Sequence, residues 1–364
     1  MSSKEEWTEA TKLLGWMVCA KRRLTWKEMQ VALSIDVENQ AIEYENKHLR
    51  KHIHEICGSL ISVHSDRVSF VHSTAKMYAM FDILQASHAD ISRFITHVMS
   101  DIHEPSIECD LTVLCLQYLT FPCFETRKAG DEKQLQQLAL QGYLAFQDYA
   151  VAMWFHHVNA FVNSGQDFLN QGSHQGARLA SMSLALDDFM TNYCEIDWER
   201  GLVEKCKDSC RAFEGLSLYE DLVLLTSHIY TFQEKGFEAR HRISIGNLDK
   251  ALTQNRRILE ELPAELEKHR ATGDLATYRK FYDAERLYKC NRITCRYFSD
   301  GFKDKRSRKH HVNVHDRPFH CDVQDCLGAE GFAKDSDLQK YNILTPALSS
   351  SATDFEQTHA SVPS

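Results

Sequence analysis

The sequence contains no long apolar run. No stretch approaches the roughly 20 apolar residues that a membrane-spanning helix needs, and the first seven residues do not form the apolar core of a signal peptide. Eight of the twelve cysteines are scattered without the spacing of a disulfide framework. We therefore expect a reducing intracellular location, nucleus or cytoplasm, and no membrane partner.

Motifs of catalysis are also missing. The Gly-x4-Gly-Lys-Ser/Thr loop that binds nucleotide phosphates occurs nowhere, and no paired carboxylates or nucleophile triad stand in a convincing context. His72-Ser73 resembles a nucleophile pair, but the end of a hairpin followed by a helix N-cap at Ser73 explains it better. We expect neither enzymatic activity nor a bound nucleotide.

Charge is distributed unevenly along the chain. The net charge at pH 7 is −9, yet residues 286–320 hold ten Lys and Arg against three Asp and Glu, which gives +7 there and −16 elsewhere. Binding to a polyanion needs such a concentration of positive charge. Nucleic-acid contact is therefore expected in 286–320, and the acidic remainder argues against the whole chain coating nucleic acid.

Two copies of a cysteine motif lie in the C-terminal third, joined by an Asp-Arg-Pro linker. Each has an aromatic residue two positions before a Cys pair: Tyr288, Cys290 and Cys295 in the first copy, and Phe319, Cys321 and Cys326 in the second. Zinc favours thiolate and imidazole ligands, and a tetrahedral site needs four. The pattern predicts tandem ββα zinc fingers of the Cys2His2 type.

The first copy keeps all four ligands. In such a finger the core aromatic residue precedes the first ligand His by nine positions, and Phe302 has this spacing to His311. His310 competes with His311, but its use would break the aromatic spacing. We predict Zn²⁺ bound by Cys290, Cys295, His311 and His315.

The second copy has lost a ligand. Phe332 is followed at nine positions by Tyr341, and the next histidine is His359, in a Ser/Thr-rich tail. Cys321 and Cys326 remain candidate metal ligands, but we favour a finger without zinc over one that bypasses Tyr341 through His359. The composition changes near residue 344, which predicts a disordered tail and suggests a truncated or misread gene end.

The helix of the first finger offers residues for nucleic-acid contact. The usual base-contacting positions −1, 3 and 6 fall on Asp304, Ser307 and His310. None is an Arg, whose pairing with guanine is the commonest specific contact. Arg306 and Lys309 lie beside them, so attraction to phosphate is better supported than base discrimination. The basic run 303–309 also resembles a nuclear import cluster.

The first 85 residues predict a winged-helix-like unit. Its expected elements are helices at 4–20, at 25–33 with a capping box of Thr25 and Glu28, and at 46–57, a hairpin of 59–63 and 68–72, and a last helix through Met80. The basic turn Lys21-Arg22-Arg23 is interpreted as solvated, with phosphate contact as the alternative.

Segments 15–34 and 70–78 resemble the module that follows the NTPase domain in fungal NACHT-type signalling ATPases of the STAND class. The resemblance implies a winged helix that acts as a lever on a nucleotide domain. Some relatives carry similar C-terminal fingers, so it covers most of the chain. Because the nucleotide domain is absent, hydrolysis is not carried over, and the chain looks like the C-terminal part of such a protein or a gene that has lost its front.

Residues 86–285 show helical periodicity almost throughout. The longest run, 134–162, is rich in aromatic residues, which predicts core packing. His156 and His157 would point about 100° apart on a helix, so they are not expected to share a metal. Cys206 and Cys210 are expected to be buried. The charged segment 243–270 is predicted to break at Pro263 and to lead as a semi-rigid connection toward the fingers.

The predicted fold class is mainly α. Its expected parts are a winged-helix-like unit at 1–85, an all-α region at 86–285, a zinc finger at 286–317, a degenerate finger at 318–343 and a tail at 344–364. We predict a zinc-binding protein that contacts nucleic acid and regulates transcription. The alternative is a signalling scaffold derived from a NACHT-type receptor, in which the helical region binds proteins and the finger is structural.

Overall fold

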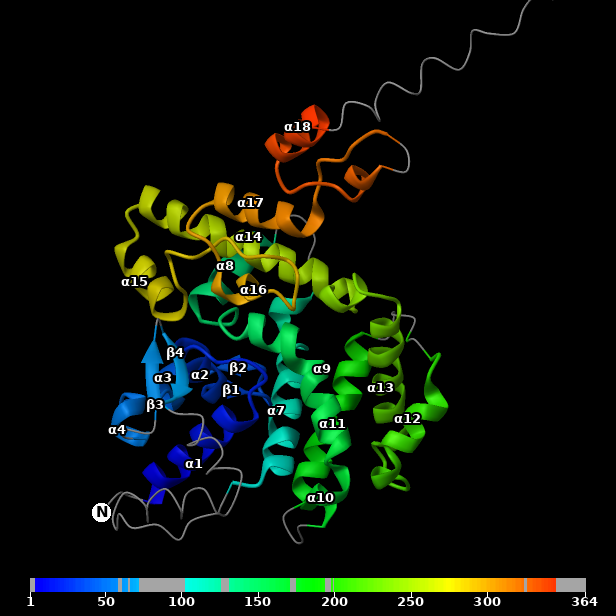
Figure 1. Ribbon diagram of the computed structural model, residues 1–364. Helices are drawn as coiled ribbons and strands as arrows, with labels where there is room; N and C mark the ends of the chain where they lie inside the picture. Colours follow the sequence, from blue (N-terminus) through cyan, green and yellow to red (C-terminus); the bar gives the residue numbers. More distant parts are fainter. Residues whose placement is uncertain are drawn as a thin grey trace, which may run out of the picture. The chain divides into compact units, whose positions relative to one another are not determined.

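The computed structural model describes residues 4–57, 61–64, 66–71, 102–125, 131–170, 175–193, 198, 200–323 and 326–344. The chain divides into two compact units, Met1–Ala284 with Arg292–Cys295 and Glu285–Asn291 with Arg296–Ser364. In the described residues the first unit is helical apart from two small antiparallel strand pairs (Figure 1). This confirms the mainly α class. Among the described helices, none is long and apolar enough to span a membrane.

The N-terminal part has the expected sequence of helices followed by a hairpin. Its elements are α1 (Lys4–Cys19), α2 (Trp26–Leu33), β1 (Ile35–Asp36), β2 (Ala41–Ile42), α3 (Tyr44–Lys47), α4 (Ile53–Cys57), β3 (Ile61–His64) and β4 (Arg67–Phe70). Thr25 caps α2 in a capping box with Glu28, as predicted. The expected last helix through Met80, and His72-Ser73, lie outside the described residues.

The hairpin is built from the pairing that the sequence predicts. β3 and β4 run antiparallel with Ile61 opposite Phe70, and Asp66 in the turn has a φ of 65°. The segment before α2 adds to β4, since the Val68 amide donates to the Leu24 carbonyl at 2.9 Å. The hairpin is thereby attached to the helices as a wing.

The helix expected at 46–57 is wrong, because the chain forms two short helices, α3 and α4, with a non-helical segment between them. Gln30 explains the break. Its side-chain amide donates to the Leu49 carbonyl at 3.1 Å and accepts from the Leu49 amide at 2.8 Å. A backbone held in this way by a buried side chain is not available to a continuous helix.

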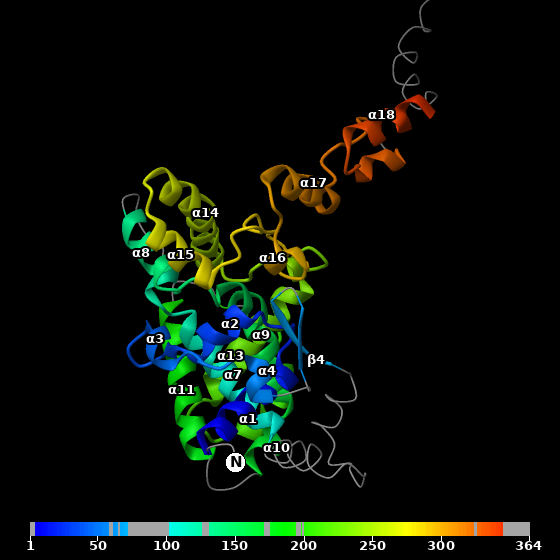
Figure 2. The ribbon, with the colours of Figure 1, turned by 90° about the vertical axis from the view of Figure 1, so that its left-hand side faces the viewer.

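The rest of the first unit is an all-α assembly. Its elements are α7 (Glu104–Tyr118), η2 (Pro122–Phe124), α8 (Glu132–Leu140), α9 (Gln147–Asn163), α10 (Gly165–Leu169), α11 (Gln175–Asn192), α12 (Val203–Ser209), η3 (Arg211–Phe213), α13 (Tyr219–Glu234), η4 (Ala239–His241), α14 (Gly246–Lys268) and α15 (Thr272–Phe281). Helices α7, α9 and α11 lie side by side (Figures 1 and 2).

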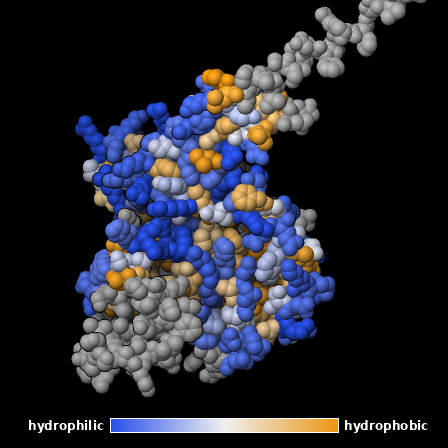
Figure 3. All heavy atoms as spheres, in the orientation of Figure 1, coloured by the Kyte–Doolittle hydropathy of each residue, from blue (hydrophilic) through white to orange (hydrophobic). Residues whose placement is uncertain are grey.

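Aromatic side chains of α9 form much of the core, as predicted. Tyr149 and Phe161 are fully buried and Trp154 is 2% exposed. Cys206 and Cys210 are also buried, as expected. The surface that Figure 3 shows is mainly hydrophilic, with small hydrophobic patches. The predicted apolar run 134–162 is two helices, because Gly142 adopts a φ of 88° and turns the chain between α8 and α9.

The predicted break at Pro263 is wrong, because α14 continues through this residue. A proline inside a helix deprives the carbonyl four residues earlier, here that of Leu259, of its amide donor. The Tyr278 hydroxyl replaces that donor and lies 2.8 Å from the Leu259 carbonyl. The Tyr282 hydroxyl also donates to a backbone carbonyl, that of Ala139, at 2.7 Å. The segment expected to be a connection therefore belongs to the packed core.

The second unit contains both cysteine motifs apart from the segment Arg292–Cys295. Its helices are α16 (Tyr297–Asp300), α17 (Lys305–Asp316), η5 (Leu327–Glu330) and α18 (Asp335–Leu344). The two strands expected in each finger are reduced to one isolated bridge, Tyr288 with Phe302 and Phe319 with Phe332. The extra residues before each Phe form α16 and η5 instead of strand.

Candidate metal centre

The first cysteine motif brings together four side chains that could hold a metal ion. The ligand atoms of Cys290, Cys295, His311 and His315 all lie within 4.8 Å of one another. Zinc–ligand bonds of 2.0–2.3 Å in a tetrahedron place the ligand atoms about 3.3–3.8 Å apart. The two imidazole Nε2 atoms are 3.0 Å apart, so small adjustments would accommodate an ion. Two thiols and two imidazoles are the donor set that zinc prefers.

Local structure places the two histidines of the group. His311 and His315 are one turn apart on α17 and therefore share a face. The His311 ring packs against Tyr297 and Phe302, with ring centroids 4.8 and 5.0 Å away. Burial lowers the pKa of His311, which favours the neutral imidazole that a metal requires. The predicted pairing of Phe302 with His311 is thus present in space.

Two glycines are essential to this geometry, and sequence reasoning missed them. Gly301 has a φ of 68°, and a Cβ there would lie 2.2 Å from the Arg286 carbonyl oxygen. Gly331 has a φ of 84°, and its Cβ would lie 2.2 Å from the Arg317 carbonyl oxygen. Both glycines directly precede the core phenylalanine, so a shared Gly-Phe pair was the available signal. The two copies therefore use the same backbone turn.

The second motif does not gather a comparable set. Tyr341 stands where the third ligand would be, and its hydroxyl is 3.0 Å from the Cys326 sulfur. The Gly328 amide also donates to that sulfur, at 3.4 Å. Among the described residues, the metal-compatible group is that of the first motif alone. His359 lies outside the described residues.

The residues predicted to contact nucleic acid lie along α17. Asp304 is the N-cap, and it accepts hydrogen bonds from the Ser307 amide at 2.7 Å and the Ser307 hydroxyl at 2.8 Å. Arg306, Lys309 and His310 are exposed. Asp304 and Ser307, two of the three positions expected to contact bases, are thus hydrogen-bonded to each other at the helix N-cap. Arg306 and Lys309, by contrast, face solvent.

Two of the three residues of the basic turn after α1 are held in ion pairs, contrary to the expectation of a solvated turn, whereas Arg23 is exposed. Lys21 pairs with Glu108, and Arg22 pairs with Glu28 at 2.6 Å. The Lys21–Glu108 pair joins the winged helix to α7 within the first unit, whereas the Arg22–Glu28 pair lies within the winged helix itself. Gly15 of α1 lies close to α7 as well, since a Cβ there would be 2.4 Å from Ile107.

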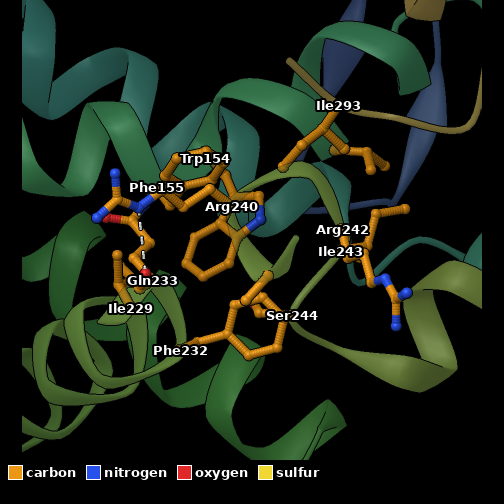
Figure 4. Close-up of a pocket in the computed structure, with 12 residues that line it drawn as sticks. Trp154, Phe155, Ile229, Phe232, Gln233, Arg240, Arg242, Ile243, Ser244 and Ile293 are labelled. Atoms are coloured by element: carbon orange, nitrogen blue, oxygen red, sulfur yellow. Dashed lines mark hydrogen bonds between the residues drawn. The ribbon is translucent and has the colours of Figure 1, made fainter. Parts of the chain in front are cut away.

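A cavity in the first unit is too small for an organic ligand. It is lined from α9 by Trp154 and Phe155, from α13 by Phe232, and from the following segment by Arg240 (Figure 4). Ile293 also borders it. Its volume of about 20 Å³ holds little more than one water molecule. The cavity offers no substrate site.

Comparison with known proteins gives one finding on the N-terminal part. The family model described as "GPI inositol-deacylase, winged helix domain" matches residues 1–91 of the 364. The predicted winged helix is thereby confirmed, and the match concerns that domain alone. No NACHT or zinc-finger family model matches. Searches of curated proteins and of solved structures found no match.

Proposed function

We propose that this chain is a zinc-binding protein whose first finger contacts the phosphates of nucleic acid and takes part in regulating transcription in the nucleus. The observation that carries the proposal is the convergence of Cys290, Cys295, His311 and His315 within 4.8 Å. Four protein ligands leave no open position on a tetrahedral zinc ion, so the metal would be structural.

Exposed charge on α17 supports phosphate contact. Arg306 and Lys309 lie three residues apart on the helix and are both exposed, so they present positive charge on neighbouring positions. Asp304 and Ser307, by contrast, are bound to each other. Base discrimination through those two positions would require the N-cap hydrogen bonds to be given up. We therefore expect binding with little sequence preference.

A second candidate function is a protein scaffold with a purely structural finger. The contacts of Lys21 with Glu108 and of Gly15 with Ile107 favour it. They join the winged helix and the helical region into a single compact body. Such a body suits protein contacts, in keeping with the implied origin in a NACHT-type receptor.

Zinc content of the purified full chain tests the common element of both candidates. We expect about one zinc per chain, lost in Cys290→Ser and in His311→Ala. The matched control is Cys57→Ser, since Cys57 is a buried thiol of the winged helix and its loss should leave the zinc content unchanged. A zinc-free wild-type chain would contradict the proposal.

Salt-dependent binding to mixed-sequence duplex DNA separates the two candidates. Contact with phosphate releases counterions, so the affinity should fall steeply as salt rises. A scaffold with a structural finger predicts no such binding at any salt concentration. Zinc retained without DNA binding would therefore favour the scaffold.

A further inference from the structure

Helices α7 and α11 border a groove that the proposed function does not use. The two helices lie side by side (Figure 1), and the turn between β1 and β2 contributes Val37 to the lining. The volume of this α7–α11 groove is about 660 Å³, within the range of about 300–1,000 Å³ that is usual for sites of small organic ligands. It is therefore large enough for a ligand, unlike the cavity beside Trp154.

The lining residues of α7 combine an apolar middle with two polar ends. They are spaced at i, i+3, i+4 and i+7 and so share one side of the helix: Asp110, Val113, Leu114 and Gln117. Two turns of helix separate Asp110 from Gln117 by about 10 Å. Ala177 adds apolar lining from α11. A bound molecule of matching length would therefore meet apolar surface along its body and polar groups at its two ends.

Gln117 offers an unused hydrogen-bond acceptor at one end of the groove. The residue is 6% exposed, and its buried Oε1 has no hydrogen-bond partner among the residues that the structure describes. Most buried polar side-chain atoms have such a partner, because leaving one unpaired is unfavourable. Gln30 of the same unit shows the capacity of this side chain, since it makes two hydrogen bonds with the Leu49 backbone. A hydroxyl or N–H group of a ligand would satisfy Gln117 Oε1.

An ion pair forms the other end of the groove. Arg178 Nε donates to Asp110 Oδ1 at 2.9 Å, and Arg178 Nη2 donates to Oδ2 at 3.2 Å. This two-point pairing balances the charges and leaves the N–H groups of Arg178 Nη1 for another acceptor. A ligand anion placed there would lie close to the Asp110 carboxylate and be repelled by it. A neutral carbonyl oxygen therefore suits this end better than a second carboxylate.

We propose that the α7–α11 groove binds a small, neutral, amphipathic molecule. Its apolar body lies on the aliphatic lining, its hydroxyl or N–H group donates to Gln117 Oε1, and its carbonyl oxygen accepts from Arg178. Val37 belongs to the winged helix, so the bound molecule would contact the winged helix as well as α7 and α11. This inference depends neither on zinc nor on nucleic-acid contact.

The test uses the full chain and a matched pair of fluorescent probes. Methyl 6-hydroxy-2-naphthoate is neutral, with an aromatic body, a hydroxyl donor at one end and an ester carbonyl at the other. Methyl 6-methoxy-2-naphthoate has the same body and ester but no donor. We expect saturable binding of both probes by fluorescence anisotropy, with the hydroxyl probe bound about three- to ten-fold more tightly, the value of one hydrogen bond.

Gln117→Leu removes the acceptor and keeps a side chain of similar size. We expect the affinity for the hydroxyl probe to fall by about three- to ten-fold, while the affinity for the methoxy probe stays the same or rises. This difference separates the hydrogen bond from a change of fold, because a distorted groove would weaken both probes alike. Equal losses for the two probes would overturn the role assigned to Gln117.

Ala177→Phe places a larger side chain at the groove itself. Ala177 is exposed on α11 and lines the groove, so the phenyl ring should block both probes without disturbing the core. Ala180→Phe is the matched control, because Ala180 is an exposed residue of the same helix that does not line the groove. Thermal unfolding by circular dichroism shows that both variants fold.

Two results would overturn the proposal as a whole. One is the absence of saturable binding of either probe to the wild-type chain. The other is binding that Ala177→Phe leaves unchanged, because the probes would then bind elsewhere. Tighter binding of the free acid, 6-hydroxy-2-naphthoate, than of its methyl ester would overturn the choice of a neutral ligand. Each of these results leaves zinc content and DNA binding as they were, so this failure is distinguishable from failure of the proposed function.

Discussion

His157 Nδ1 lies 2.7 Å from the Glu108 carboxylate in the buried core of the first unit. The other ring nitrogen lies 2.8 Å from the Tyr149 hydroxyl. Glu108 also accepts from Lys21, which follows α1. One buried carboxylate therefore connects α7 and α9 to the winged helix. For His157 the sequence predicted only that it shares no metal ion with His156. Its hydrogen bonds to Glu108 and Tyr149 were not visible from helical periodicity.

Removing the Glu108 charge should destabilise the first unit. Glu108→Gln leaves Lys21 without its counter-charge, and His157 faces a neutral amide. Breaking a buried pair in this way typically costs about 3–5 kcal/mol, and we expect about 2–4 kcal/mol here because the amide retains some hydrogen bonding and Lys21 is partly exposed. Urea unfolding followed by circular dichroism measures the loss.

Glu204→Gln is the matched control for that experiment. It makes the same change in an exposed pair with Lys207 on α12. Exposed pairs contribute about 0–1 kcal/mol, so the unfolding midpoint should barely move. Equal losses in the two variants would show that the buried carboxylate has no special role.

His157 should make stability depend on pH. Burial lowers the pKa of His157, although Glu108 opposes the shift and Lys21 adds to it. In the unfolded chain the imidazole takes up a proton below about pH 6.5, whereas the folded imidazole stays neutral to lower pH. The unfolded state then binds more protons, so the free energy of unfolding falls as the pH drops below about 6.5.

The measurement compares urea midpoints near pH 7.5 and pH 5.5 for the wild type and His157→Gln. Other histidines titrate in both proteins, including His156, whose pKa burial also lowers. The difference between the two proteins isolates His157 and amounts to at most about 1.4 kcal/mol per pH unit. Identical pH dependence in the two proteins would refute the assignment.

Capping motifs, hairpin patterns and helical periodicity predicted the elements correctly where neighbouring residues alone determine the structure. The capping box of Thr25 and Glu28, the hairpin around Asp66 and the aromatic face of α9 all appear as expected. The errors came from side chains distant in sequence. The Gln30 side chain forms hydrogen bonds with the Leu49 backbone, which interrupts the helix expected there. The Tyr278 hydroxyl replaces the donor that Pro263 removes. Because Gln30 and Tyr278 lie outside the segments whose structure they change, patterns within those segments did not reveal these contacts.

The candidate metal centre was predictable because its four residues lie close together in the sequence at characteristic spacings. Cys290 to His315 spans one short stretch, and the position of Phe302 fixes which histidine faces the site. The loss of the third ligand at Tyr341 was visible in the same way. What the sequence did not show is that Tyr341 bonds the Cys326 sulfur, or that Asp304 and Ser307 bond each other. Such contacts depend on side-chain positions.

Arg306→Ala combined with Lys309→Ala should weaken DNA binding by the first finger and reduce its salt dependence. Each lost phosphate contact lowers the slope of log affinity against log salt by about 1, so the double variant should lose about 2. The control is Lys205→Ala with Lys207→Ala, which removes the same charge from α12. A slope that falls equally in both variants would indicate a general charge effect, not contact by α17.

Gly301→Ala should impair zinc binding although it changes no ligand. The residue has a φ of 68°, and the new Cβ would lie 2.2 Å from the Arg286 carbonyl oxygen. Backbone strain of this kind costs about 1–3 kcal/mol, and the clash with a backbone atom cannot be relieved by rotating a side chain. The turn before Phe302 would open and move that ring away from His311. Competition with a chromophoric chelator should show zinc held at least about five-fold more weakly.

Gly273→Ala is the control, because no atom lies within 4 Å of its Cβ position and its φ is not positive, so zinc affinity should not change. Equal affinity in Gly301→Ala and the wild type would mean that the turn at Gly301 does not set the position of the ligands.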